Sequence, residues 1–262
     1  MSIRKKILAT SIGPVLVLGV ITLLFMLTMV KSSLMDEVQD ALKGTAAATL
    51  AAYDQNTGDY LESTNGDIWK GSYNISKSEN LVDRIKENTG MDVTFFYGNK
   101  RIMTSALDKK GNRILGSEAG ERVVNQVIKG KKPFFSTNVS LDGTRNYGYF
   151  IPVYQNGTTD QVIGMVFVGT NKARKDAIVN KILGSIMMAL LVVMLLCIVT
   201  AMRMAASISK NIKNSVAVVG KLADGDLNVW VDEKLLKRKD EIGDLSRGTM
   251  TSVCYTHLRA HE

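Results

Sequence analysis

The sequence predicts an α+β domain enclosed between two membrane-spanning helices and followed by a helical segment. Two apolar runs, residues 7–30 and 182–202, contain no charged side chain, and a helix that crosses a bilayer needs about 20 such residues. Between these runs, a helical apolar pattern is followed by short β-rich stretches separated by Gly, Asn and Asp. The predicted parts are residues 1–6, 7–30, 31–181, 182–202, 203–252 and 253–262.

Basic residues predict the orientation in the membrane. They lie at the end of each run that is away from the enclosed domain. Arg4, Lys5 and Lys6 precede the first run, and Arg203, Lys210 and Lys213 follow the second. Because basic flanks favour the cytoplasm, we expect residues 31–181 outside the cell membrane and both termini in the cytoplasm. The first run is longer than the roughly 7 to 15 apolar residues of a signal peptide, so we expect an uncleaved anchor and a multi-pass protein.

The composition argues against several functions. The formal net charge is +8, but basic and acidic residues are interleaved, so we expect no nucleic-acid partner. Both cysteines, Cys197 and Cys254, lie outside the outer domain, which therefore has no disulfide. The two histidines, His257 and His261, lie in the last six residues. Without the commonest general base and metal ligand in the body of the chain, we expect no enzyme activity, no cofactor and no metal site.

The outer domain is predicted to begin with a helix and to continue as a sheet. Apolar residues at helical spacing predict a long helix over residues 31–53. No element is assigned to the polar stretch 56–66. A short helix is expected over 81–88 and a crossing helix over 118–128. Alternating and β-branched runs predict an antiparallel sheet of about five strands, at residues 93–97, 102–107, 134–139, 145–154 and 161–169.

Short segments of the outer domain resemble a single Cache domain of the PAS-like extracytoplasmic sensors. They are residues 92–97, 99–104, 151–154 and 162–169, and their order and their place between two spans carry the likeness. The likeness covers about half of the outer domain. It implies a small-molecule ligand held between the sheet and its covering loops.

The sequence after the second span resembles a HAMP domain with an incomplete second helix. An apolar seam is followed by Gly-Asp-Leu at 225–227 and Asp-Glu-Ile-Gly at 240–243. The seam consists of Ile208, Ile212, Val216, Val219 and Leu222. Asn211 stands where the family usually has proline, which leaves the kink of the first helix open. The seam predicts a parallel homodimer. The resemblance assigns the signal relay to Ile208, Ile212, Leu222, Gly225, Leu227, Glu241 and Gly243. Residues 253–262 resemble no receptor segment and are expected to be non-native.

The candidate ligand contacts come from the predicted sheet. Arg101 can hold a carboxylate with two parallel hydrogen bonds, so we expect a small organic anion, a carboxylate, as the ligand. Alternation places Thr104 on the opposite strand face, so a bulge or twist is needed to bring it beside Arg101. Tyr147 and Tyr149 share one face and carry hydroxyl donors. The Cache resemblance groups these four residues, and Lys132 is a further candidate. The alternative is a solvated arginine and two core tyrosines.

The combined modules resemble the N-terminal part of a bacterial methyl-accepting chemotaxis protein, truncated before its signalling domain. The resemblance implies that the chemotaxis kinase and its adaptor are contacted only through that missing C-terminal domain. Two alternatives remain open. The same modules precede sensor histidine kinases and diguanylate cyclases, and the chain could also be a membrane-tethered binding module without an output.

Overall fold

The computed structural model describes residues 3–224, 233–239, 243–244 and 246–251. The chain divides into two compact units. One unit is Phe25–Ser185, and the other combines Met1–Leu24 with Ile186–Glu262. The first unit contains the sheets and the candidate ligand site, and the second consists of helical segments among its described residues.

A five-stranded antiparallel sheet forms the centre of the Phe25–Ser185 unit, and it confirms the predicted α+β class. The strand order is β5-β4-β8-β7-β6. The strands are β4 (Asp92–Tyr97), β5 (Lys100–Thr104), β6 (Phe134–Leu141), β7 (Thr144–Tyr154) and β8 (Val162–Asn171). Asp142 and Gly143 join β6 to β7 with φ angles of 45° and 77°. Two successive positive φ angles are typical of a two-residue hairpin turn whose twist matches that of the strands.

A second, smaller antiparallel sheet begins in the polar stretch 56–66 and continues just after it, where no strand was predicted. It consists of β1 (Tyr60–Glu62), β2 (Ile68–Lys70) and β3 (Tyr73–Asn74), in that order. These strands have two or three residues each. Strands of this length are too short to show an alternating pattern in the sequence.

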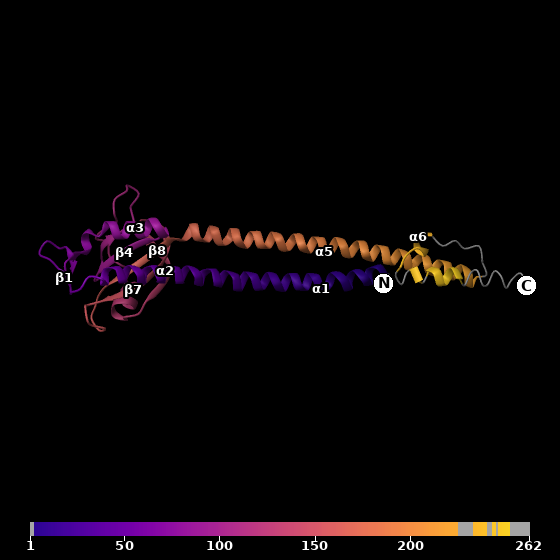
Figure 1. Ribbon diagram of the computed structural model, residues 1–262, viewed down its shortest axis with the longest axis horizontal. Coiled ribbons are helices and arrows are strands. Elements are labelled where there is room, and N and C mark those ends of the chain that lie inside the picture. The colour runs from indigo at the N-terminus through magenta and orange to yellow at the C-terminus, as the bar shows by residue number, and fades with distance from the viewer. Residues whose placement is uncertain (1–2, 225–232, 240–242, 245, 252–262) are drawn as a thin grey trace, which may run out of the picture. The chain divides into compact units, whose positions relative to one another are not determined.

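Two helices cover one face of the large sheet. The predicted long helix is α2 (Lys31–Asp54), which packs against β7 and β8 (Figure 1). Its buried side chains recur at helical spacing: Val38, Leu42, Ala46, Thr49 and Tyr53. The second helix is α3 (Glu79–Thr89), which follows the 3-10 turn η2 (Ile75–Lys77) and ends at Gly90 with a φ of 68°. Tyr53 anchors this core, because its hydroxyl bonds to Ser78 Oγ at 2.9 Å and its ring meets Phe95 edge-on.

The opposite face of the sheet is covered more sparsely. The short helix α4 (Glu121–Val123) continues as the π-helix η3 (Val124–Lys129), in place of the predicted helix over 118–128. It packs on a separate apolar cluster that includes Phe96, Phe150 and Phe167. The thin cover leaves room for a cavity on this face.

Two long apolar helices stand before and after the domain in sequence. The first begins with α1 (Ile3–Phe25) and passes through the π-helical turn η1 (Met26–Val30) into α2. The second is α5 (Lys172–Ala223), which follows β8 directly and precedes the short α6 (Glu233–Leu236). Their most apolar windows have mean hydropathies of 2.4 and 3.0, and both helices are long enough to cross a bilayer. Two such helices flanking the domain are consistent with a membrane protein.

Candidate functional site

A cavity of about 500 Å³ lies on the sheet face opposite α2. Residues from all five strands of the large sheet, from α4 and from the loop before α4 line it. The lining comprises Phe96, Arg101, Glu118, Ala119, Gly120, Arg122, Val123, Phe134, Phe135, Ser136, Thr137, Asn138, Val139, Ser140, Phe150 and Phe167. A cavity of this size, with apolar walls and few polar groups, has the character of a small-molecule site.

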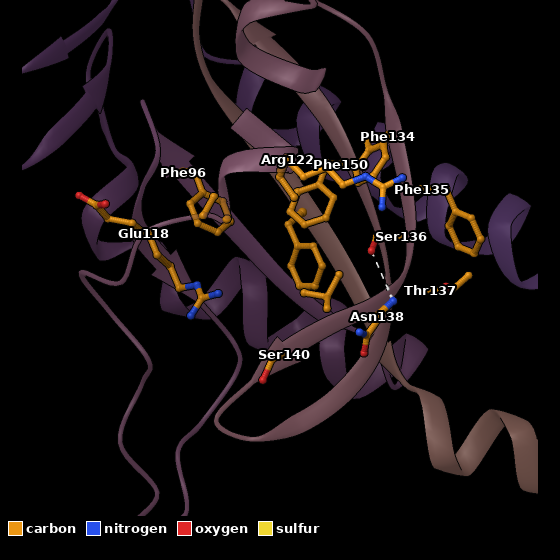
Figure 2. A pocket seen from close by; sticks show the side chains of 16 residues that line it. Phe96, Glu118, Arg122, Phe134, Phe135, Ser136, Thr137, Asn138, Ser140 and Phe150 are labelled. Carbon is orange, nitrogen blue, oxygen red and sulfur yellow. Dashed lines mark hydrogen bonds between the residues drawn. The ribbon is translucent and has the colours of Figure 1, made fainter. Parts of the chain in front are cut away.

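Aromatic rings form the apolar part of the cavity (Figure 2). The centroids of Phe150 and Phe167 are 4.7 Å apart, and those of Phe134 and Phe150 are 6.5 Å apart. Gly148 makes room for this arrangement. A Cβ atom at Gly148 would lie 2.5 Å from the ring of Phe167 and 2.8 Å from Val139 Cγ2. Glycine therefore lets the ring of Phe167 lie close to the backbone of β7.

Arg101 is the buried cation of the cavity. A register shift between Phe95 and Phe96 pairs Phe96 with Arg101, and the guanidinium carbon lies 5.3 Å from the centre of the Phe96 ring. Only 8% of the residue is exposed. Its Nη1 donates to Ser117 Oγ at 2.8 Å and, at 3.4 Å, to the carbonyl of Ile114.

The guanidinium of Arg101 is incompletely satisfied. Its Nε is buried and has no hydrogen-bond partner among the described residues, and no carboxylate there lies within ion-pair distance. Burial lowers the pKa of Arg101, and the negative charge of Asp92 opposes that shift. A buried cation without a counter-ion is costly, and an anion in the cavity would supply the missing charge.

Two further charged residues line the cavity, on different sides. Arg122 lies near Phe134, with its guanidinium carbon 5.5 Å from the ring centre, whereas Glu118 lies on the side of Phe96 (Figure 2). Figure 2 also shows the carboxylate of Glu118 directed away from the rings. The lining thus holds two arginines and one glutamate, a net formal charge of one positive unit.

Thr104 joins the same strand face as Arg101 but does not line the cavity. The β4–β5 register shift supplies the bulge that the sequence analysis required, since it pairs Thr104 with Thr94 and Arg101 with Phe96. Thr104 is fully buried, and its hydroxyl bonds to Thr94 Oγ1 at 2.7 Å and donates to the Val93 carbonyl at 3.2 Å. The hydroxyl is therefore occupied within the sheet.

The structure does not group Tyr147 and Tyr149 with Arg101, which corrects the predicted pocket. Both tyrosines belong to the core under α2, because alternation along β7 turns Phe150 toward the cavity and its tyrosine neighbours toward the helix. The Tyr147 hydroxyl donates to Asp176 Oδ1 at 2.5 Å and accepts from Lys172 Nζ at 3.1 Å. Desolvation raises the pKa of Tyr147. Lys132 is exposed ahead of β6 and does not line the cavity.

The predicted relay residues are described only in part. Ile208 and Ile212 lie in α5 and are half-buried. Leu222 lies in the same helix, but its side chain is outside the described residues, as are Gly225, Leu227 and Glu241. Gly243 is described, and a side chain there would meet the backbone of Arg238. The relay assignment stays a prediction.

Several cavity residues were not singled out from the sequence. They are the rings Phe96, Phe134, Phe150 and Phe167, the charged residues Glu118 and Arg122, and the β6 side chains Ser136, Thr137, Asn138 and Ser140. Alternation along β7 did place Phe150 opposite the tyrosines, and this was the available signal. The contribution of α4 had no such signal, because it depends on which sheet face the helix covers.

Comparison with known families supports a sensor domain. Residues 73–182 match the family model described as Single cache domain 3. This segment contains every residue that lines the cavity. The match supports a Cache-domain sensor, and Cache domains bind small-molecule ligands. No curated protein matches the chain.

Proposed function

We propose that this chain is the input module of a transmembrane chemoreceptor that binds a small extracellular organic anion, a carboxylate, in the cavity holding Arg101. The single observation that carries the proposal is the state of Arg101, a buried cation with an unpartnered Nε and no carboxylate partner among the described residues. A carboxylate would neutralise the guanidinium and accept a hydrogen bond from its unpartnered Nε. Charge-assisted hydrogen bonds of this kind are among the strongest in proteins.

The remainder of the cavity supports the same ligand class. Its net positive charge favours an anion, and its aromatic walls lower the local dielectric, which strengthens the attraction. The lining residues include neither histidine, lysine nor cysteine. Its serine and threonine hydroxyls therefore have no base of these types within the lining to activate them. We accordingly propose binding and not catalysis.

Signal transfer is proposed to run through the second helix into the HAMP-like segment and on to a methyl-accepting domain. With the basic flanks in the cytoplasm, residues 31–181 lie outside the membrane. The helix surface after the second span supports a homodimer, because Val216 and Val219 are 64% and 51% exposed in a single chain. A parallel partner helix would bury them together with Ile212.

Ligand titration tests the binding proposal. The full chain in lipid nanodiscs is screened by thermal shift with organic acids, amino acids and neutral solutes, and each hit is titrated calorimetrically. Loss of a charge-assisted contact from a desolvated site costs about 1.5–3 kcal/mol, so Arg101→Gln should weaken carboxylate binding roughly tenfold to a hundredfold. Arg145→Gln is the matched control, because Arg145 is exposed and outside the cavity lining. Binding of neutral solutes alone, or unchanged carboxylate affinity in Arg101→Gln, would refute the proposal.

The output is tested separately by sequencing the genomic locus. A heptad-patterned hairpin with glutamate and glutamine methylation sites after the HAMP-like segment supports the chemoreceptor. A kinase or cyclase domain in that position rejects it and leaves the ligand proposal standing.

A further inference from the structure

We infer that the ligand is a monocarboxylate with a bulky apolar body, about the size of an aryl ring, and not a short polar acid. This inference rests on the proposed function, since it names the class of anion that the same cavity takes. It is carried by the shape and chemistry of the walls around Arg101.

The volume of the cavity exceeds the needs of the smallest acids. A cavity of about 500 Å³ lies within the range that holds drug-sized ligands. Acetate would satisfy the guanidinium of Arg101 and leave most of this space to water in contact with aromatic rings. An apolar body attached to the carboxylate would displace that water and bury apolar surface, which favours binding.

The rings define where this body lies. Phe96 lies under the guanidinium of Arg101, and Phe150 and Phe167 continue the apolar surface from there across the sheet. Phe134 closes the other side, with the guanidinium of Arg122 over its ring. A carboxylate held at Arg101 therefore directs the rest of its molecule along a path of aromatic side chains, where edge and face contacts add to simple burial.

The charges specify a single carboxylate. The net charge of the lining is one positive unit, and the guanidinium of Arg122 is already placed over Phe134 near the surface. Glu118 already offsets one of the two arginine charges, so a second carboxylate would leave the occupied cavity with a net negative charge. A monoanion thus matches the lining better than a dicarboxylate does.

The test compares three probes on the full chain in nanodiscs: phenylacetate, acetate and phenylacetamide. Phenylacetate and acetate share the carboxylate, and phenylacetate and phenylacetamide share the ring. We expect phenylacetate to bind roughly tenfold to a hundredfold more tightly than acetate because of the buried ring, and more tightly than the neutral amide.

Two aromatic residues supply a matched pair of variants. The Phe134 ring lies in the cavity near Phe150, whereas Tyr97 packs against the core on the other face of the sheet and does not line the cavity. Phe134→Ala should weaken phenylacetate binding about tenfold and leave acetate binding unchanged. Tyr97→Ala should change neither affinity. The comparison of probes on the unsubstituted chain needs no variant, so it remains decisive if a variant fails to fold.

The outcomes separate this inference from the proposed function. If acetate binds as tightly as phenylacetate and both lose affinity in Arg101→Gln, the apolar body is refuted and the anion site stands. If phenylacetamide equals phenylacetate and Arg101→Gln has no effect, the anion site itself is refuted. If neither phenylacetate nor acetate binds at millimolar concentration, both this inference and the proposed anion site are overturned.

Discussion

Replacing Arg101 with methionine should make the unliganded domain more stable while abolishing its anion site. Only 8% of Arg101 is exposed, its Nε lacks a partner, and no carboxylate of the described residues lies within ion-pair distance of it. Methionine keeps a side chain of similar length, so the stem can still pack beside Phe96. The variant therefore removes a buried charge without opening a large void.

The change in the free energy of unfolding is the difference between the contacts that Arg101 loses and the desolvation cost that its removal relieves. The lost contacts are the hydrogen bonds to Ser117 and to the Ile114 carbonyl and the guanidinium contact with Phe96, together worth about 2–3 kcal/mol. The relieved cost is the desolvation of an unpaired cation and an unsatisfied donor, which amounts to several kcal/mol. The net expectation is a gain of about 1 kcal/mol. For a domain of this size, that raises Tm by about 2–4 °C.

The assay is thermal unfolding of the full chain in nanodiscs without ligand, followed by titration with phenylacetate. Arg113→Met is the matched control, because Arg113 is a paired arginine. It contacts Asp83 through both terminal nitrogens, at 2.8 and 2.5 Å, and donates to the Thr104 carbonyl at 2.7 Å. Asp83 is partly exposed, so solvent screening limits the loss in this control to about 1–3 kcal/mol.

We expect Arg101→Met to raise the stability of the unliganded chain and Arg113→Met to lower it. If Arg101→Met lowers stability by as much as Arg113→Met, then Arg101 is a structural residue whose contacts satisfy it. Arg101 would then need no anion in the cavity to neutralise it.

Three further predictions concern other parts of the chain. The hydrogen bond from Arg113 lowers the pKa of Asp83 below its ordinary value of 3.8. The ionised Asp83 therefore stabilises the folded chain fully above pH 3.8, and this stabilisation is lost as the pH falls through the pKa of Asp83 in the folded state. The Tm difference between the unsubstituted chain and Asp83→Asn should accordingly shrink from pH 6 to pH 2.5, and a constant difference would contradict the assignment. Gly148→Ala should cost about 1–3 kcal/mol in urea unfolding, because the new methyl group collides with Phe167. Gly44→Ala, on the open surface of α2, should stabilise the domain by about 0.5–1 kcal/mol instead. A single cysteine at Ile212 should form an interchain disulfide in membranes, and the absence of crosslinks at every seam position would reject the parallel dimer.

Local pattern in the sequence determined the kinds and the order of the longer elements, but not the three short strands of the small sheet. The apolar runs at 7–30 and 182–202 predicted long helices because a charge-free stretch of that length leaves few other structures possible. The helical and the alternating apolar patterns separated α2 from the strands. The breaks at Gly, Asn and Asp separated the strands from one another, and Asp142-Gly143 is one such break, where both residues adopt positive φ angles. Each of these features depends on neighbours a few positions away, so the sequence alone carries them.

The tertiary structure decided which side chains meet. Arg101 reaches the cavity because the register shift in the β4–β5 pair places it opposite Phe96, and the sequence showed only that a bulge was needed to join it to Thr104. The tyrosines of β7 turn away from the cavity because α2 covers that face of the sheet. Alternation divides a strand into two faces but does not say which face a distant helix covers. That choice comes from the packing of segments far apart in the chain, and it determines where the cavity lies.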